Sequence, residues 1–242
     1  MAEDKVVLVG VDGSPESLGA VDWAVARAAR SGWRVHILCA YSLPSFTTAS
    51  LDGGYAALDD TAIRSGAQAV VDEAVTRAQG KGVTVTSSLE TGDPAGVLVD
   101  LSDEATLAVV GTRGGGGFAD RLLGTVSSAL PAHAHCPTVV VPRHVEGAEY
   151  TPVGRIVVGV DGSDSARKAL RWAVREAEVW GAELTAIAAV PMASGAGALA
   201  WLPAAVDREQ VLADVRSGLD RAINEALEGH EGVTVRRHAL DG

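Results

Sequence analysis

The sequence predicts an α/β protein whose main domain is a doubly wound, open parallel sheet of five strands, followed by a partial second copy. Short apolar runs alternate with segments of helical periodicity, as in parallel sheets that are covered on both faces. Apolar residues make up 47% of the 242-residue chain and aromatic residues 4%, so the core is built mainly from Ala, Val and Leu. One long segment of the chain also recurs, which predicts two related domains.

The first strand and the first helix carry distinct sequence markers. Val6–Gly10 is a nearly continuous apolar run, which is typical of a buried parallel strand. Ser14 provides an N-cap, Pro15 suits the first helical position, and Gly32 ends the apolar pattern of helical spacing. The apolar run at 35–40 then predicts the second strand.

The next elements follow the same alternation. The segment 42–54 is rich in Ser, Thr, Gly and Pro and predicts a loop. A helix is expected over 59–79 and a third strand over 83–89. Asp93 and Pro94 predict the start of a third helix, again as a cap followed by a proline.

A glycine-rich segment follows the apolar run at 107–110, which predicts a fourth strand. Gly111, Gly114 and Gly124-Thr125 have the spacing Gly-x2-Gly-x9-Gly-[Ser/Thr]. Glycines let backbone N–H groups approach phosphate oxygens, and a helix N-terminus adds unpaired donors and a favourable dipole. We therefore predict a phosphate-binding loop, with Thr125 as the N-cap of the next helix. The alternative is a flexible glycine linker between two packed elements.

The remaining part of this domain is expected to hold one helix and one strand. Pro131 lies inside the helix, where proline removes a backbone N–H and is expected to cause a kink beyond the phosphate loop. Thr138–Val141 is the last apolar run and predicts the fifth strand.

The second copy begins at Arg155 and repeats the first at a constant offset of 149, so that Asp161 matches Asp12. It holds nothing that corresponds to 93–142, and hence no glycine loop. We expect a complete domain over 1–146, a linker over 147–153 and an incomplete second domain over 154–242. The chain is either a fragment or a natural one-and-a-half-domain protein, and the sequence leaves both open.

Composition excludes several classes of function. A net charge of −11 opposes non-specific binding to nucleic acid or to an anionic membrane. The N-terminus is not that of a secretory signal, and no apolar run is long enough to span a bilayer. The two cysteines, Cys39 and Cys136, are too few for a disulfide scaffold. A cytoplasmic protein is expected.

Familiar catalytic motifs are not found in the sequence. It holds no Gly-x4-Gly-Lys-[Ser/Thr] and no Gly-x-Ser-x-Gly, so neither a P-loop NTPase nor an α/β-hydrolase is expected. His133-x-His135-Cys136 has no evident fourth ligand nearby, and a helix end is the preferred interpretation. No catalytic residue is assigned.

The motifs VGVDGS, TGDPA, VVGTRGGGGF…LLGTVS and HAHCPTVVVP together resemble the universal stress protein family in its tandem two-domain form. The resemblance covers nearly the whole chain and implies a Rossmann-like fold of the adenine nucleotide alpha hydrolase-like group. It also implies ATP as the ligand, with Mg²⁺ carried by the nucleotide. AMP or cyclic AMP in place of ATP stays open.

The resemblance further implies a set of site residues. Asp12 resembles the acid that lies beside the ribose and the metal-bearing phosphates, although an ordinary Asp-Gly turn is the alternative. The backbone of Ala40 and Tyr41 is expected to contact adenine. The nucleotide-binding residues expected are Gly10, Val11, Asp12, Ala40, Tyr41, Gly111, Gly114, Gly124, Thr125, Val126 and Ser127.

The sequence therefore predicts an ATP-binding regulatory protein of the stress response. One alternative is a slow Mg-dependent ATPase or phosphoryl-transfer enzyme, and another is a scaffold that acts without nucleotide. In the family the last strand pairs across a dimer interface, so a homodimer through Thr138–Val141 is expected.

Overall fold

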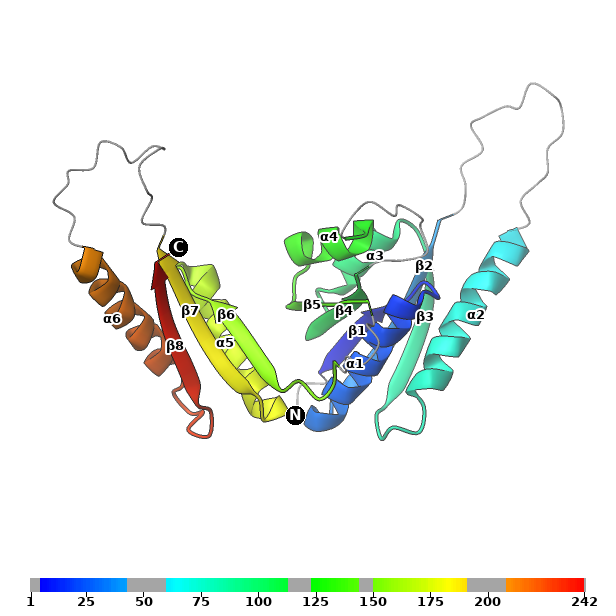
Figure 1. Ribbon diagram of the computed structural model, residues 1–242. Coiled ribbons are helices and arrows are strands. Elements are labelled where there is room, and N and C mark those ends of the chain that lie inside the picture. The colour runs from blue at the N-terminus through cyan, green and yellow to red at the C-terminus, as the bar shows by residue number, and fades with distance from the viewer. Residues whose placement is uncertain (1–4, 43–59, 113–122, 144–149, 191–207, 242) are drawn as a thin grey trace, which may run out of the picture. The chain divides into compact units, whose positions relative to one another are not determined.

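The computed structural model describes residues 5–42, 60–112, 123–143, 150–190 and 208–241. The chain divides into two compact units, Met1–Tyr150 and Thr151–Gly242, which are described here one at a time as unit 1 and unit 2. Both units alternate strands and helices along the chain (Figure 1).

Unit 1 contains a five-stranded sheet with the strand order β3-β2-β1-β4-β5. Every described pair in this sheet is parallel, so the predicted doubly wound α/β fold is confirmed. The strands are β1 (Val6–Gly10), β2 (Arg34–Tyr41), β3 (Val85–Thr91), β4 (Leu107–Gly111) and β5 (Thr138–Val141).

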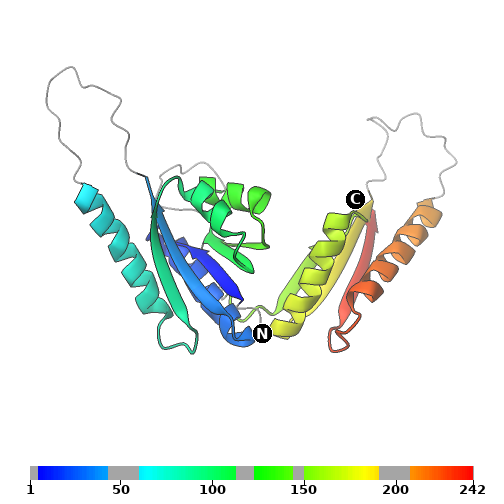
Figure 2. The ribbon, with the colours of Figure 1, turned by 180° about the vertical axis from the view of Figure 1, so that it is seen from behind.

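Four helices cover the two faces of this sheet. Helices α1 and α2 contact each other on one face, and α3 and α4 contact each other on the opposite face (Figures 1 and 2). Leu98 of α3 and Leu130 of α4 pack with Leu8 and Leu38 of the sheet in one buried cluster. The helices are α1 (Pro15–Ser31), α2 (Asp60–Ala78), α3 (Pro94–Leu101) and α4 (Thr125–His133).

The strand order reverses direction between β1 and β4. The chain moves outward from β1 through β2 to β3, and then returns to the other side of β1 for β4 and β5. Ligands of open α/β sheets bind beyond the carboxyl ends of the strands at such a switch point. The connections that follow Gly10 and Gly111 start at this position.

The helix caps predicted at Ser14, Gly32 and Asp93 are confirmed. The hydroxyl of Ser14 accepts the N–H of Ser17, and the carboxylate of Asp93 accepts the N–H of Gly96. Gly32 ends α1 with a left-handed φ of 66°, and its N–H donates to the carbonyl of Ala28. Each of these helix ends is marked either by a capping side chain followed by a proline or by a terminal glycine. The local sequence therefore determines where α1 and α3 begin and where α1 ends.

Unit 2 repeats the first half of this arrangement. Its parallel sheet has the order β6-β7-β8, and α5 and α6 pack against one face in a single apolar cluster. The elements are β6 (Arg155–Gly159), α5 (Asp164–Trp180), β7 (Glu183–Val190), α6 (Arg208–Ala226) and β8 (Val235–Asp241). The predicted partial second copy is thus a three-stranded sheet.

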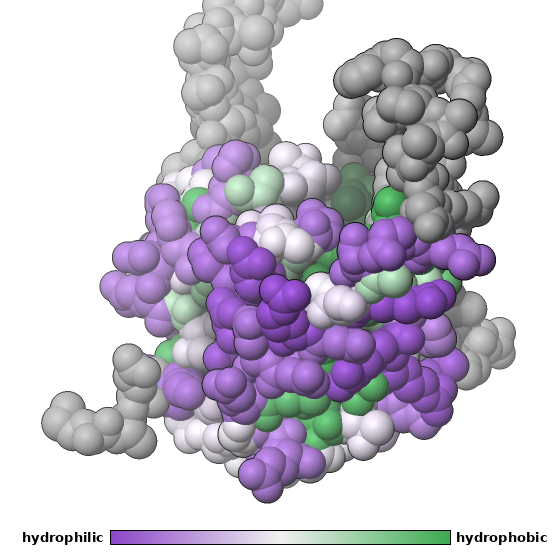
Figure 3. All heavy atoms as spheres, turned by 90° about the vertical axis from the view of Figure 1, so that its left-hand side faces the viewer, coloured by the Kyte–Doolittle hydropathy of each residue, from purple (hydrophilic) through white to green (hydrophobic). Residues whose placement is uncertain are grey.

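The opposite face of the unit 2 sheet is open in the part of the chain that is described. Val157 is 65% exposed and Leu240 is 47% exposed, whereas Leu8, which matches Val157 in unit 1, is 2% exposed. The difference arises because α3 and α4 cover this face in unit 1. By contrast, the outer side of α6 and its neighbours is mostly hydrophilic (Figure 3).

Candidate functional site

Two adjacent strand ends form the centre of the candidate site. β1 ends at Gly10 and β4 ends at Gly111, and the two strands pair directly. Val11 continues from β1, is buried, and donates its N–H to the carbonyl of Leu38 in β2. The structure therefore brings the carboxyl ends of β1, β2 and β4 together around Val11.

Asp12 lies in the exposed turn between β1 and α1. Its Oδ1 accepts the N–H of Ser14 at 3.0 Å and the hydroxyl of Ser14 at 2.6 Å. In unit 2 the Oδ1 of Asp161 likewise accepts the N–H of Ser163, at 2.9 Å. Both aspartates thus order the turn that leads into a helix, as Asx turns do. This structural role does not depend on a ligand.

Gly111 is held against the first turn of α1. A Cβ at this position would lie 2.6 Å from the carbonyl carbon of Glu16 and 2.8 Å from its oxygen. Gly10 is similarly restricted, because its Cβ would lie 2.8 Å from Cδ1 of Leu98. Gly111 is therefore required by packing against backbone atoms, in addition to any contact with a ligand, whereas the obstacle at Gly10 is the end of the Leu98 side chain.

The N-terminus of α4 lies beside the end of β4. The N–H of Gly124 donates to the carbonyl of Thr112 at 2.9 Å, and the hydroxyl of Ser127 donates to the same carbonyl at 2.7 Å. Ser127 is buried, and its hydroxyl also lies 3.2 Å from the carbonyl of Gly124. These bonds fix the first turn of α4 at the switch point. They leave Ser127 its backbone N–H to offer to a ligand.

The prediction that Thr125 is the N-cap was wrong. Gly124 occupies the cap position with φ −78° and ψ 174°, and no side chain among the described residues caps the helix. This backbone conformation is open to any residue, so the glycine is not needed for a left-handed turn. By contrast, the caps of α1, α3 and α5 all use a side chain, from Ser14, Asp93 and Ser163.

The uncapped start of α4 has a chemical consequence. The first N–H groups of a helix have no partner within the helix, and together with the helix dipole they attract anions. Here that end lies beside the end of β4, the strand that pairs with β1, because Gly124 is bonded to Thr112, one residue past β4. The arrangement can hold an anionic group through backbone donors.

Two further predicted site residues lie at the end of β2. Ala40 and Tyr41 extend beyond the pairing with β1, whose last pair is Gly10 with Leu38. Both are half-buried, and the carbonyl of Tyr41 accepts the N–H of Gly92. Val126 is half-buried in the first turn of α4. Gly114 lies outside the described residues.

Sequence reasoning missed the residues that hold this site in place. Thr112 links β4, β5 and α4 through its backbone, since its N–H donates to the carbonyl of Val141 at 2.9 Å. Ser17 adds a buried hydroxyl that donates to the carbonyl of Ser14 at 2.9 Å. Neither residue has a distinctive sequence pattern, because both act through bonds to backbone atoms.

Within the described residues, no three or more His, Cys, Asp and Glu side chains are grouped so as to hold a metal ion. His135 donates its N–H to the hydroxyl of Ser102 just after α4 ends. The described helices include none that is both long and apolar enough to cross a membrane.

Comparisons with known proteins place the chain in one family. The model of the universal stress protein family matches residues 5–142 and 152–242. The universal stress protein Rv2623 of Mycobacterium tuberculosis is 32% identical over 226 residues, covering 88% of this chain and 73% of the relative.

One solved structure gives the same result for the fold. A universal stress protein from Archaeoglobus fulgidus is similar over 100% of this chain and 80% of its own, with a TM-score of 0.70 and 19% identity. A universal stress protein solved in complex with cAMP is 30% identical, covers 59% of this chain and 100% of its own, and has a TM-score of 0.45. The match to the family model and the 32% identity to Rv2623 agree with this fold, so the chain belongs to the universal stress protein family.

Proposed function

We propose that the protein is a regulatory protein that binds an adenine nucleotide, with ATP held by unit 1. The observation that carries the proposal is the uncapped N-terminus of α4, fixed beside the ends of β1 and β4. Phosphate groups suit such a position, because they accept several backbone N–H bonds and benefit from the helix dipole.

In this proposal the phosphates bind the backbone N–H groups at the start of α4. The adenine lies against the end of β2, and the ribose lies near the turn after β1. The binding residues are those predicted from the sequence: Gly10, Val11, Asp12, Ala40, Tyr41, Gly111, Gly114, Gly124, Thr125, Val126 and Ser127.

Mg²⁺ would enter with the nucleotide. Asp12 is exposed and lies in the turn at the switch point. A carboxylate there can bind a hydrated Mg²⁺ ion that is carried by the nucleotide. Because one of its oxygens already orders the turn through Ser14, its position is fixed before the ion arrives.

Binding, rather than rapid turnover, is the expected activity. Phosphoryl-transfer enzymes of the P-loop type place a lysine on the terminal phosphates, and this sequence has no such motif. A saturable ATPase rate that is abolished in Asp12→Ala would contradict this part of the proposal and favour the slow enzyme.

The test is to denature freshly purified protein and to identify any released nucleotide by chromatography and mass. The variant Gly124→Asp places a carboxylate at the N-cap, where it stabilises the helix but repels and displaces a phosphate. Gly232→Asp adds the same charge at an exposed glycine of unit 2, where a Cβ meets nothing within 4 Å, and serves as the control.

We expect about one nucleotide per chain in the parent and in Gly232→Asp, and none in Gly124→Asp. If no nucleotide is released, the parent and Gly124→Asp are titrated with Mg-ATP, Mg-ADP, AMP and cyclic AMP, and their affinities are compared. Equal affinity in the parent and in Gly124→Asp, or no binding by either protein, contradicts the proposal and favours the nucleotide-independent scaffold.

A further inference from the structure

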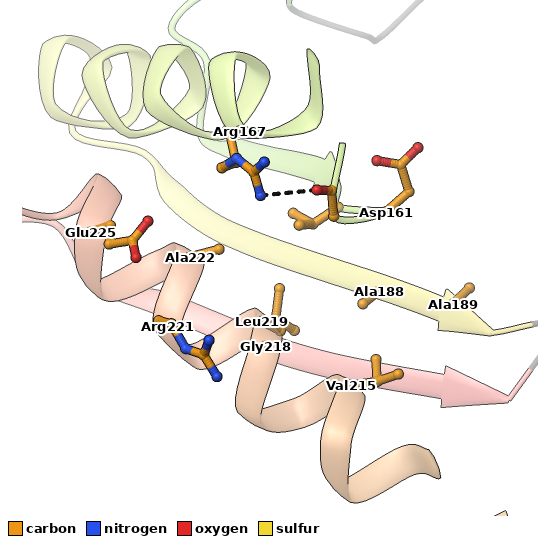
Figure 4. A pocket seen from close by; sticks show the side chains of 12 residues that line it. Asp161, Arg167, Ala188, Ala189, Val215, Gly218, Leu219, Arg221, Ala222 and Glu225 are labelled. Carbon is orange, nitrogen blue, oxygen red and sulfur yellow. Dashed lines mark hydrogen bonds between the residues drawn. The ribbon is translucent and has the colours of Figure 1, made fainter. Parts of the chain in front are cut away.

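The pocket at the strand ends of unit 2 offers no nucleophile beside a base. Its volume is about 310 Å³, and it lies beside the ends of β6 and β7 and the middle of α6 (Figure 4). Its described lining includes no serine, cysteine, histidine or lysine. Its Arg167 is already bonded to the carboxylate of Asp164 and to the carbonyl of Gly162. A pair of reactive side chains lies instead in unit 1, on the strands β2 and β3.

His36 of β2 is bonded through both ring nitrogens. Its Nδ1 lies 2.9 Å from Oγ1 of Thr86, and its Nε2 lies 2.9 Å from Oγ of Ser88. Thr86 and Ser88 are alternate residues of β3, so both side chains stand on the face of the sheet from which His36 extends. One imidazole is thus held between two hydroxyl groups, and none of these three residues belongs to the proposed nucleotide site.

His36 and Ser88 have the geometry of a base and a nucleophile. A serine hydroxyl becomes reactive when a base at hydrogen-bond distance accepts its proton and a third group orients the base. With the ring proton on Nδ1, His36 donates to Thr86 and leaves Nε2 to accept the hydroxyl of Ser88. Ser88, His36 and Thr86 therefore supply the nucleophile, the base and the orienting group.

The protonation state of His36 suits a base. Burial first, and the charge of Arg34 second, lower the pKa of His36 below 6.5, although Glu90 opposes the shift. The ring is therefore mostly neutral at pH 7, and only the neutral ring has a nitrogen that can accept a proton.

The side of Ser88 that faces away from His36 is open. β3 lies at an edge of the sheet, and among the described residues it pairs with β2 alone. The carbonyl of Thr84 and the N–H of Gly92 both bond to β2, so the N–H of Leu89 points to the open edge. This N–H belongs to the residue after Ser88, a position from which a donor can stabilise the oxyanion of an acyl group on the serine.

A small reagent can reach this hydroxyl from solvent. His36 and Ser88 are half-buried, and Thr86 is exposed. The serine thus lies at a shallow, accessible place on the sheet surface, which suits a small substrate with a good leaving group.

The second repeat shows that the fold does not require this cluster. In unit 2, β7 and β8 form the same parallel pair. At the constant offset of 149, the residue that matches His36 is Thr185, and the residue opposite Thr185 is Arg236, where unit 1 has Thr86. The same pair of strands forms there without a histidine that is bonded to two hydroxyls of its neighbour.

We propose that Ser88 is a nucleophile that hydrolyses small activated carboxylic esters, with His36 as its base and Thr86 as the residue that orients the ring. Oγ of Ser88 bonds to the carbonyl carbon of the ester, and its proton moves to Nε2 of His36. The bond from that carbon to the alcohol oxygen then breaks, and His36 gives the proton to the departing oxygen. Water attacks the acyl-serine in the same way, which releases the acid and restores the hydroxyl.

The experiment is to mix the full chain with p-nitrophenyl acetate at neutral pH and to follow p-nitrophenolate by absorbance. Mass spectrometry of peptides then locates any acetyl group. Ser88→Ala removes the nucleophile, and His36→Asn removes the base. The matched controls are Ser87→Ala, at the neighbouring exposed serine of β3, and His238→Asn, at an exposed histidine of β8. Circular dichroism checks that each variant is folded.

Thr86 is tested by two substitutions of opposite chemistry. Thr86→Val keeps the shape and the strand propensity but removes the hydroxyl that orients the ring. Thr86→Ser keeps the hydroxyl and loses a methyl group. An orienting role predicts that Thr86→Ser retains the rate and Thr86→Val does not, whereas a role in strand stability alone predicts no loss in Thr86→Val.

We expect an acetyl group on Ser88 and a rate that falls at least about tenfold in Ser88→Ala and in His36→Asn, because a positioned base contributes about a hundredfold or more. Thr86→Val should lose at least about threefold. Thr86→Ser and the two control variants should stay within about twofold of the parent.

Three results overturn the inference. The first is a rate in a folded Ser88→Ala protein that equals the rate of the parent, with the acetyl groups on other side chains. The second is a folded His36→Asn protein that keeps the rate of the parent. The third is a loss in Ser87→Ala as large as the loss in Ser88→Ala, which would assign the effect to a disturbed strand.

Discussion

At Gly111 the end of β4 meets the first turn of α1, and the contact leaves no room for a side chain. We expect Gly111→Ala to lower the free energy of unfolding of unit 1 by about 1–3 kcal/mol, because a Cβ would overlap backbone atoms of Glu16, which cannot rotate away. Urea unfolding followed by circular dichroism measures the change.

The control for this substitution is Gly19→Ala in α1, where a Cβ meets nothing within 4 Å. Alanine in a helix interior is expected to stabilise the protein there by roughly 0.5–1 kcal/mol. A neutral effect of Gly111→Ala on the free energy of unfolding would show that packing does not require a glycine there.

Residues that cap helices through bonds within the first turn were predictable, and a residue that bonds to a distant part of the chain was not. Ser14 and Asp93 precede a proline and an apolar run, so their roles follow from local sequence. Thr125 has a capping side chain, but the helix begins one residue earlier because Gly124 is bonded to Thr112. That bond joins residues 12 positions apart, beyond the range of a local pattern.

Among the elements, α1 and α2 are joined by an exposed ionic cluster. Asp22 of α1 accepts from Nε of Arg77 at 2.9 Å and from Nζ of Lys81 at 3.0 Å. Burial alone would raise the pKa of Asp22, but the bonds from Arg77 and Lys81 outweigh it and lower that pKa below 3.8.

The lowered pKa gives a signed prediction. A carboxyl whose pKa is depressed in the folded state stabilises the protein above its unfolded pKa, and this contribution is lost as the pH falls through the folded pKa. We therefore expect Asp22→Asn to lower the free energy of unfolding at pH 7 by up to about 1 kcal/mol, because the cluster is partly exposed.

The difference between Asp22→Asn and the parent should shrink as the pH is lowered from 4 to below 3. Urea unfolding at a series of pH values measures it. Asp214→Asn, on the exposed surface of α6, controls for the loss of a carboxylate. A difference that stays constant over this range would show that Asp22 does not act through its charge.

Element boundaries were predicted to within a few residues. The third strand was expected over 83–89, but β3 runs Val85–Thr91. The shift follows from pairing, because Val85 lies opposite Val35 and Thr91 lies opposite Tyr41 at the extended end of β2. Sequence periodicity marks an apolar run, whereas the neighbouring strand decides where pairing begins and ends.

Over the whole molecule, the strand order leaves β5 at an edge of the unit 1 sheet. The carbonyls of Pro137 and Val141 accept the N–H groups of Ala108 in β4 and of Thr112 just past it. The alternate residues Thr138 and Val140 therefore direct their backbone groups to the open edge. An unpaired apolar edge invites pairing with another chain. We propose that two copies pair through this edge.

Val140→Pro should convert the dimer to a monomer, because it removes an outward N–H while leaving the bonds to β4 in place. Light scattering at tens of micromolar measures the mass, and circular dichroism checks the fold. Thr138→Val, which keeps the N–H, is the control. A parent protein that is already monomeric contradicts the proposed dimer.

The two repeats are expected to differ in stability. In unit 2 the apolar face that includes Val157 and Leu240 is exposed, whereas in unit 1 the matching face is buried beneath α3 and α4. Hydrogen exchange should therefore be faster for the amides of β7 than for those of β2, the corresponding strand. Equal protection of β2 and β7 would show that something covers this face in solution.

The repeat itself was visible in the sequence, and so were the fold and the switch point. The open face of the unit 2 sheet was not, because the exposure of Val157 depends on the helices that cover the matching face in unit 1.

The uncapped start of α4 bears on how long the polypeptide survives in the cell. α4 leads directly into β5 and carries the buried Leu130, so fraying at Gly124 would loosen both. A ligand that completes the first turn would oppose that fraying by mass action. We therefore expect the chain to be cut near α4 more slowly in limited proteolysis when the nucleotide proposed above is present than when it is absent.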